Sequence, residues 1–348
     1  MIKSDLSVKS IIATIPQECF EKSNVKSAFY LIRDFLFFAA LYSLIIWTND
    51  PIFALPLSLI LGTVLTGIFI IGHDCGHRSF SPSIAVNDWV GELTTAMALW
   101  PFHIWRLSHD IHHRHTNNIE KDIAWVPYSV SKYKRLPMLA KFIYLHSRST
   151  LFYFASSLFT FYYVMDGLRG KSSVHFKKTD LTKIRRSILI TAIVLSFYAG
   201  SSYAFAGWFG VIMLFIIPQL VFHFWLSTFT LFHHTTTKTR FMADSEWTFA
   251  KAQLESTVHV SYPQAIEWMT HDINWHVPHH VCVGIPHYHL RHAHRALTEH
   301  FGDMIHHEVF SLDLINSVIK QCHLIRGKQL GQLEWVPAEA AEPTPVTT

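Results

Sequence analysis

The chain has 348 residues, of which 50% are hydrophobic and 16% are charged, whereas an ordinary soluble domain carries about 25% charged residues. This shortage of charge argues against a typical soluble protein and indicates that much of the surface does not meet water. The formal net charge of +4 is small and dispersed along the chain, which argues against a nucleic-acid-binding protein with a concentrated basic patch.

Two apolar segments near the N-terminus, residues 31–48 and 52–72, are predicted to be membrane-spanning helices. At 1.5 Å per residue the second segment spans roughly 30 Å, the thickness of a hydrocarbon core. Only a short turn that includes Asn49 and Asp50 separates the two segments, so they are expected to form a tight transmembrane hairpin. The alternative is a helical hairpin buried in the core of a soluble protein.

A second pair of membrane-spanning helices is predicted at residues 187–205 and 208–230. Both lie in a run, residues 187–232, that contains no Asp, Glu, Lys or Arg, and His223 is the only group in it expected to titrate. A single continuous helix of this length would exceed the thickness of a bilayer. The sequence GSSYAFAG, residues 200–207, is therefore predicted to break the helix.

The distribution of basic residues predicts the orientation of the four spans in a multi-pass membrane protein. The turns within the pairs contain no Lys or Arg, whereas the segment between the pairs contains many. The positive-inside rule then places both termini and this central segment in the cytoplasm. Two further apolar stretches, residues 89–105 and 149–165, are predicted to be interfacial helices. The expected fold is therefore an all-α integral membrane protein, with residues 1–333 as one domain and residues 334–348 as a disordered tail.

Histidine is unusually frequent and is concentrated in three short segments. Most of the 25 histidines lie within residues 73–115 and 223–307. In segments 73–77, 109–113 and 276–280 the histidines are spaced by three or four residues, so each segment presents its imidazoles on one helix face. All three segments fall on the predicted cytoplasmic side, where they would form a helical cap. Their eight histidines are His73, His77, His109, His112, His113, His276, His279 and His280.

Clustered imidazoles beside membrane spans are typical of a metal site. Imidazole binds zinc, copper, iron or nickel, so the residue type does not identify the metal. A zinc ion takes about four ligands, whereas eight histidines suit two metal ions in one site. One cluster alone would indicate surface histidines on a helix, but three clusters of matching spacing favour metal binding. His234, with His233 as the alternative, is a further candidate ligand just after the last span, and His271 is a weaker one.

Other polar residues around the three segments have candidate roles of their own. A ligating histidine usually donates the N–H of its other ring nitrogen to an acceptor. Five nearby carboxylates would either accept it or be solvated surface charges: Asp74, Asp110, Glu120, Asp122 and Asp272. Nine further histidines of these regions are predicted to form a basic surface that faces lipid headgroups or a redox partner, rather than to bind metal. They are His103, His115, His287, His289, His292, His294, His300, His306 and His307.

The three segments resemble the histidine boxes of integral-membrane fatty acid desaturases. They read GHDCGHRSF, LSHDIHHRHTN and HDINWHVPHH, and their order and spacing agree with that family. The sequences STFTLFHHT, AQLESTVHVSYP and GIPHYHLRHAH are also similar to the bacterial, cyanobacterial-type acyl-lipid desaturases of the delta-12 and omega-3 group. The first box is H-x3-H, as in that group, rather than the H-x4-H of acyl-CoA delta-9 enzymes. The resemblance extends from about residue 10 to about residue 325.

The resemblance implies a membrane-bound, non-haem diiron oxidoreductase that inserts a cis double bond into a membrane-associated acyl chain, with O2 as co-substrate. It implies four spans and a cytoplasmic cap that holds two iron ions (Fe2+/Fe3+). The eight box histidines fall on the iron-binding positions of the family, and the ligand expected after the fourth span falls on His234 or His233. An acyl-lipid substrate and a separate electron donor of the ferredoxin or cytochrome b5 type are also implied, since this sequence has no HPGG haem motif.

Three other functions remain open from the sequence. The same scaffold would give another product as a fatty acid decarboxylase that forms a terminal alkene, as a hydroxylase or as an acetylenase. A non-enzymatic metal transporter or sensor would need ionisable residues inside the spans, which offer almost none beyond His223. A membrane-bound zinc hydrolase would need fewer ligands and an open coordination position.

Overall fold

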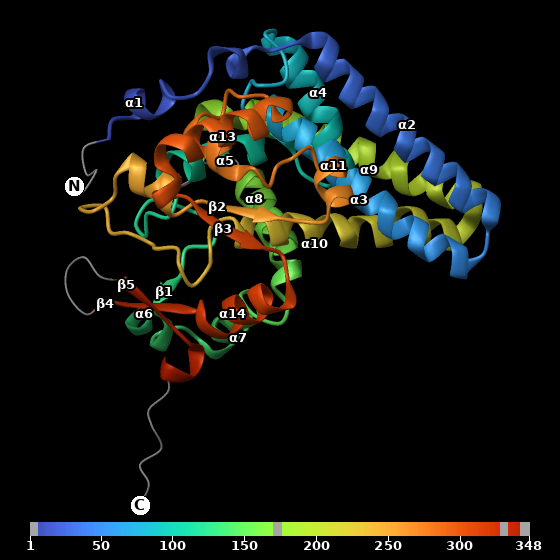
Figure 1. Cartoon of the computed structure of the whole chain (residues 1–348). Coiled ribbons are helices and arrows are strands. Elements are labelled where there is room, and N and C mark those ends of the chain that lie inside the picture. Colours follow the sequence, from blue (N-terminus) through green and yellow to red (C-terminus); the bar gives the residue numbers. More distant parts are fainter. Residues whose placement is uncertain (1–5, 170–175, 328–332, 342–348) are drawn as a thin grey trace, which may run out of the picture.

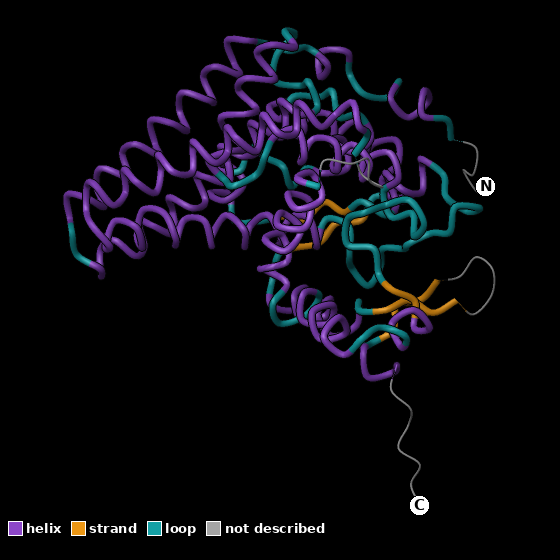
Figure 2. Tube along the Cα trace, turned by 180° about the vertical axis from the view of Figure 1, so that it is seen from behind, coloured by secondary structure: helices purple, strands orange, loops and turns teal. Residues whose placement is uncertain are grey.

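The computed structural model describes residues 6–169, 176–327 and 333–341, and this part of the chain is mostly helical. Long helices form one half of the molecule, and shorter helices with a few strands form a cap at one end of them (Figure 1). Seen from behind, the strands lie within the cap and the long helices extend away from it (Figure 2). The predominance of helix is as the sequence predicts.

Helices α2 (Asn24–Thr48) and α3 (Pro51–Gly76) form the first long hairpin. Asn49 ends α2 in a left-handed conformation with φ of 45°, and the Asp50 carboxylate begins α3 by accepting a hydrogen bond from the N–H of Ile52 at 2.8 Å. Such caps satisfy backbone groups that lack partners at helix ends. Because α3 continues beyond the predicted span, the first histidine segment lies at the end of the same rigid helix.

Helices α9 (Leu181–Gly210) and α10 (Ile217–Phe232) form the second long hairpin, joined by a short π-helical stretch. Regular helical geometry is lost at Gly207, whose φ of 58° and ψ of −146° lie in a region that only glycine adopts readily. The chain turns back there, and the Tyr198 hydroxyl donates a hydrogen bond to the carbonyl oxygen of Leu214 at 2.5 Å. The predicted break between the two arms is confirmed.

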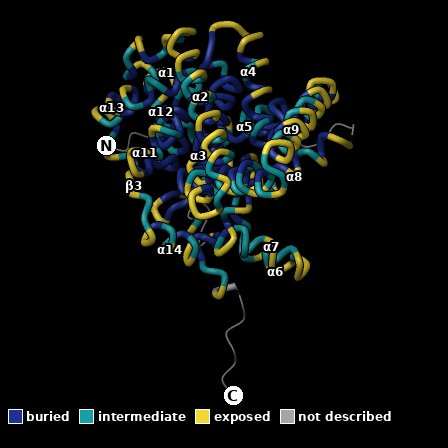
Figure 3. Tube along the Cα trace, turned by 90° about the vertical axis from the view of Figure 1, so that its right-hand side faces the viewer, coloured by how far each residue is buried: buried dark blue, intermediate teal, exposed yellow. Residues whose placement is uncertain are grey.

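Three helical segments are long and apolar enough to cross a membrane: Asn24–Thr48, Pro51–Gly76 and Lys178–Phe232. The third has 55 residues and includes both arms of the second hairpin. The long helices carry exposed apolar side chains, including Trp47, which is 81% exposed, and Phe197, which is 77% exposed. Exposed positions recur along these helices (Figure 3). Large exposed apolar faces of this kind suit contact with hydrocarbon rather than water.

Residues 89–105, predicted as one interfacial helix, instead belong to two helices, α4 (Ile84–Met97) and α5 (Phe102–His115). Pro101 separates them, because its ring fixes φ and it lacks the N–H that a continuous helix would need. α4 packs against α3 and α9, and α5 carries the second histidine segment. The other stretch predicted to be interfacial lies mostly in α8 (Ala155–Leu168).

The expectation of an all-α chain is wrong, because the described residues of the cap include five short strands. β2 (Val258–Ser261) pairs in parallel with β3 (His306–Val309). β4 (Leu324–Gly327) is the central strand of a second sheet, parallel to β1 (Tyr128–Ser129) and antiparallel to β5 (Leu333–Val336). Each sheet joins segments far apart in the chain, which is why local patterns did not indicate them.

The C-terminal tail predicted to be disordered, residues 334–348, is ordered in its first part. It begins inside β5, where Trp335 donates a hydrogen bond from Nε1 to the carbonyl oxygen of Thr239 at 3.1 Å. Residues 342–348 lie outside the described residues. The cap therefore extends further along the chain than the composition of the tail indicated.

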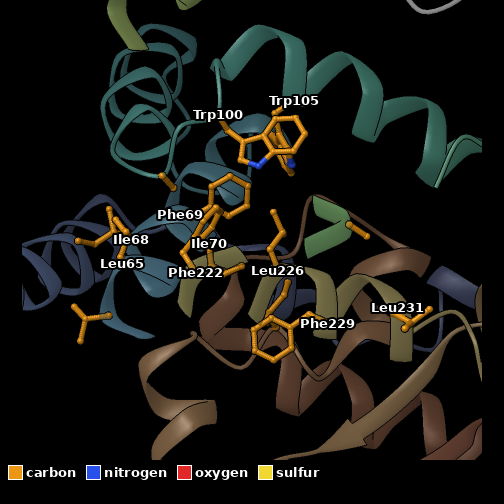
Figure 4. Packing of buried hydrophobic residues seen from close by; sticks show 14 of the residues in the cluster. Leu65, Ile68, Phe69, Ile70, Trp100, Trp105, Phe222, Leu226, Phe229 and Leu231 are labelled. Carbon is orange, nitrogen blue, oxygen red and sulfur yellow. The ribbon is translucent and has the colours of Figure 1, made fainter. Parts of the chain in front are cut away.

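Aromatic and aliphatic side chains fill the interior between the long helices and the cap (Figure 4). Phe69 of α3 packs against Trp105 of α5 with ring centroids 5.6 Å apart, and against Phe222 of α10 with centroids 5.0 Å apart. These contacts fix α3, α5 and α10 relative to one another, since each buried aromatic side chain contributes about 1.5–3 kcal/mol. The remaining α-helices are α1 (Val8–Ile12), α6 (Val130–Lys134), α7 (Met138–Ser147), α11 (Gln264–Met269), α12 (His276–Val281), α13 (Leu290–Phe301) and α14 (Leu312–Gln321).

We expect Gly207→Ala to lower the free energy of unfolding by about 1–3 kcal/mol, because alanine in this backbone conformation is strained. Thermal unfolding of the purified protein in detergent measures the effect as a lower Tm. Gly200→Ala is the control: the added methyl group meets no atom within 4 Å, and alanine favours a regular helix, so Tm should stay or rise. Equal Tm values for the two variants would contradict a role for Gly207 in the turn.

Candidate metal centre

Three helices bring the histidine segments together where the cap meets the long helices. The first segment lies at the end of α3, the second on α5 and the third on α12. α3 and α5 approach closely because Gly76 has no side chain, and a Cβ there would lie 2.5 Å from the Trp105 ring. Trp105 in turn packs against His73 and His109, with ring centroids 5.2 and 4.5 Å apart. Gly76 thus allows the first two segments to meet.

Five of the histidines form a first group, in which one nitrogen of each ring lies within 4.8 Å of the others. Nε2 of His113 is 3.0 Å from Nε2 of His109 and 3.1 Å from Nε2 of His279. A neutral imidazole has one N–H and one lone pair, so five convergent rings cannot all satisfy one another by hydrogen bonds. A cation among them would satisfy their lone pairs together. The members are His73, His77, His109, His113 and His279.

A second group lies beside the first. His112, His234 and His280 place nitrogens within 4.8 Å of one another. His276 joins them, because its Nε2 is 3.1 Å from Nε2 of His234 and 3.0 Å from Nε2 of His280. The two groups adjoin, since the ring of His113 stacks on that of His280 with centroids 4.0 Å apart. All eight box histidines and one histidine after α10 are therefore brought together, in an arrangement that fits two metal ions.

Of the two histidines that follow α10, only His234 places a ring nitrogen among those of these groups. Its Nε2 is 3.2 Å from Nε2 of His112. The ring of His233 instead packs on Phe229 and His276, with centroids 5.7 and 4.4 Å apart. Neither nitrogen of His233 has a hydrogen-bond partner within the described part of the chain. The geometry favours His234 as the ligand.

Hydrogen bonds to the outer nitrogens hold several rings in place. Nδ1 of His112 donates to the carboxylate of Asp122 at 2.9 Å, and Nδ1 of His280 donates to Oε1 of Gln253 at 3.0 Å. When Nδ1 carries the proton, Nε2 keeps its lone pair and faces the other ligands. Sequence reasoning missed Gln253, because a neutral amide far from the three segments has no spacing that would identify it.

Two of the five carboxylates considered as acceptors contact candidate ligands. Asp122 holds His112, and the carboxylate of Asp74 lies 3.4 Å from Nδ1 of His73. The other three form no hydrogen bond to a clustered histidine among the residues that the structure describes; they are Asp110, Glu120 and Asp272. Sequence proximity alone therefore did not separate supporting carboxylates from surface ones.

Burial lowers the pKa of seven of the clustered histidines well below the ordinary value, and neighbouring imidazoles lower it further. A lowered pKa keeps these rings neutral at pH 7, and the neutral imidazole is the form that binds metal. Imidazole nitrogen suits iron, zinc, copper and nickel. The residues affected are His77, His109, His113, His234, His276, His279 and His280.

Three histidines predicted to lie on a basic surface are buried instead. Nδ1 of His103 donates to the Glu92 carboxylate at 3.2 Å, and Nδ1 of His287 donates to Asp74 at 3.0 Å. His294 is the third, and it is only 2% exposed. The six others are exposed or half-buried, as predicted: His115, His289, His292, His300, His306 and His307.

His271, the weaker ligand candidate, belongs to neither group. Its Nε2 lies 2.6 Å from the carboxylate of Asp34 on α2. Its ring packs against the ring of His287, with centroids 4.5 Å apart. Because His287 bonds Asp74 next to His73, His271 is part of a buried polar layer behind the first group.

A cavity of about 750 Å³, largely apolar, leads from between α7 and α8 toward the two groups. Its inner end adjoins a narrower pocket of about 90 Å³, which is bounded by His109 of the first group and His112 of the second. A hydrocarbon chain that filled both spaces would reach both groups. The two spaces share four lining residues: Ile123, Trp125, Phe159 and Tyr163.

The chain is similar in sequence to proteins that act on fatty acids. The fatty acid desaturase family model matches residues 50–310. The chain is 39% identical over 327 residues to the sn-1 oleoyl-lipid 12-desaturase of Synechocystis sp., covering 92% of this chain and 90% of the relative. It is 36% identical over 323 residues to the protein of the same name from Picosynechococcus sp., with the same coverage. The chloroplastic omega-6 fatty acid desaturase of Spinacia oleracea is 32% identical, over 93% of this chain and 70% of the relative.

We expect His234→Ala to lower the metal retained by the purified protein at least about tenfold, because it removes a nitrogen ligand from the second group. His233→Ala is the matched control and should retain the metal, since its ring lies outside that group. Inductively coupled plasma mass spectrometry gives metal ions per chain for both variants. Loss of metal from His233→Ala with retention in His234→Ala would reverse the assignment.

Proposed function

The chain belongs to the fatty acid desaturase family, and from this premise we propose that it is an O2-dependent acyl-lipid desaturase. Its reaction inserts a cis double bond into a membrane-associated acyl chain. The observation that carries the proposal is the position of His109 and His112 in the wall of the inner pocket, which adjoins the cavity. A hydrocarbon chain lying there would be in reach of both histidine groups.

The nine clustered histidines are suited to hold two iron ions, which would activate O2 so that it can remove hydrogen from an unactivated methylene. In the overall reaction, one C–H bond breaks on each of two neighbouring carbon atoms and one C=C bond forms. O2 takes up these two hydrogen atoms together with two electrons and two protons, giving two water molecules. The two electrons come from a separate donor of the ferredoxin or cytochrome b5 type.

The protein's own residues orient the ligands and exclude water. Asp122 holds the ring of His112 with its outer N–H bonded, so that Nε2 is presented to the second group. Trp100, Trp105 and Leu226 line the inner pocket with apolar surface. This surface holds a methylene next to the ligands and keeps water from the reacting carbon atoms.

In the membrane we propose four crossings, made by the α2–α3 and α9–α10 hairpins, with both termini and the histidine groups on the cytoplasmic side. The turn at Gly207 supports this, because a straight 55-residue helix would be about 80 Å long, against about 30 Å of hydrocarbon. Lys and Arg residues also lie in the segment between the two hairpins, and the turns within the hairpins contain none. This is the distribution that the positive-inside rule requires.

Cells that express this protein should gain an unsaturated acyl chain in their lipids, because the centre removes two hydrogen atoms from a saturated stretch. Gas chromatography with mass spectrometry of lipids and headspace detects the product. His279→Ala, which removes a member of the first group, should abolish it. A terminal alkene, hydroxy or acetylenic product without a new double bond would keep the scaffold but overturn the proposed reaction.

Ala124→Trp should block the inner pocket, which has only about 90 Å³. We expect at least about a 100-fold loss of desaturation, because a small displacement of the reacting carbon has an effect of this size. The metal content should not change, and Ala124→Ser, which preserves the volume, should retain most of the activity. Full activity in Ala124→Trp would exclude this pocket as the acyl site.

A further inference from the structure

One long stretch of the chain is basic and apolar without an acidic residue. Between Asp122 and Asp166 there are five Lys and Arg residues and no Asp or Glu. Four of the five lie on or next to α6 and α7, beside large apolar side chains of α7. These eight residues are named the α6–α7 surface: Lys132, Lys134, Arg135, Met138, Leu139, Lys141, Phe142 and Ile143.

The apolar members of the α6–α7 surface face outward. The exposed fractions are 86% for Met138, 71% for Leu139, 55% for Phe142 and 46% for Ile143. Positions spaced in this way lie on one face of a helix. α8 also exposes apolar side chains, including Phe161, which is 68% exposed. A contiguous exposed apolar face of this kind marks a site of contact with a membrane or a partner.

The basic members of this surface have no acidic partner. Within the described residues, none of Lys132, Lys134, Arg135 and Lys141 forms an ion pair. The first three are also exposed. Lys and Arg residues flanking an apolar helix face are typical of a helix that lies in the membrane interface and is attracted to anionic lipids.

The same elements line the outer part of the cavity that leads to the histidine groups. Lys132 of α6, Ile143 and Tyr144 of α7, and Leu158 and Tyr162 of α8 all contribute to its wall. α6 and α7 lie together beyond one end of α8 (Figure 1). An acyl chain entering between α7 and α8 would therefore pass from apolar surface to apolar cavity without crossing water.

A further cation, Arg148, lies in the cavity wall and is only 3% exposed. It donates from Nη1 to the carbonyl oxygen of Trp125 at 2.6 Å and from Nε to that of Cys322 at 3.3 Å. Its Nη2 has no hydrogen-bond partner in the described ranges. The carboxylates of the same wall, Glu120 and Asp122, accept hydrogen bonds from other groups. A buried cation without a counterion is unfavourable, so this wall is suited to an anionic group.

We propose that the α6–α7 surface docks on anionic phospholipids, and that such a lipid passes its acyl chain through the cavity between α7 and α8. The inference rests on the proposed function and narrows its substrate class to phospholipids with a negatively charged headgroup. The bilayer is favoured over an acidic protein because α8, which lines the same cavity as α7, also exposes apolar side chains, and the outer faces of the long helices are also apolar.

The docking is tested on the full chain in phosphatidylcholine vesicles with and without phosphatidylglycerol. An environment-sensitive fluorophore is attached at Leu139→Cys in a Cys282→Ser background, because the other three cysteines are buried. We expect blue-shifted emission, and stronger quenching by brominated phosphatidylglycerol than by brominated phosphatidylcholine. A label at Glu299→Cys, an exposed position on α13, is the control and should report water in both vesicles.

Charge is tested with the double variant Lys134→Gln/Arg135→Gln. Each basic residue near an anionic surface contributes about a fivefold preference, so the variant should lose the preference for phosphatidylglycerol at least about tenfold. Lys9→Gln/Arg295→Gln removes the same charge from exposed positions elsewhere and should leave the preference unchanged.

Desaturation is measured separately in the same vesicles, so that failed docking and a wrong reaction are distinguishable. If the fluorophore at residue 139 shows the emission typical of water in vesicles both with and without phosphatidylglycerol, the proposal is overturned. Equal quenching by the two brominated lipids, or a preference that survives the double variant, would also overturn it. Protection of the label only after addition of an acidic protein would assign the surface to a protein partner instead.

Discussion

The structure depends on one constraint: nine imidazoles converge in a dry interior, where they cannot satisfy one another by hydrogen bonds. A neutral ring offers one N–H and one lone pair, and burial keeps the ring neutral. Each buried polar atom without a partner costs about 1–3 kcal/mol. The surrounding fold therefore has to hold the rings in a costly arrangement that a metal ion would relieve.

The rest of the fold meets this constraint through close packing around α3. Gly76 allows the Trp105 ring to approach α3, as described above. Gly67, also on α3, allows the end of α11 to approach α3 closely, because a Cβ there would lie 2.1 Å from the carbonyl oxygen of Met269. Met269 ends α11, from which the chain passes to the third histidine segment. Gly67 and Gly76 thus allow α11 and α5 to pack closely against α3.

The sequence predicted well what depends on local spacing and missed what depends on packing. The box histidines of each segment share a helix face, and the long helices contain uncharged runs, so the clustering of histidines and the long apolar helices could be predicted. His233 and His234 are neighbours, and what distinguishes them is that only the ring of His234 lies beside His112 and His280. His294 was taken for a surface residue because α13 is rich in charge, although it shares a face with the buried Leu290 and Leu297. The short strands pair segments distant in the chain, so no local pattern indicated them.

The position of the third histidine segment has a consequence for biosynthesis. His73 and His279 meet in one group although they lie near opposite ends of the chain. A ribosome releases α3 and the second hairpin well before α12, so a nascent chain holds only part of the ligand set. Neither group can close until the cap has folded. A complete set of candidate ligands would therefore exist only late in maturation, and the unfinished chain would offer only an incomplete site to metals that bind imidazole tightly.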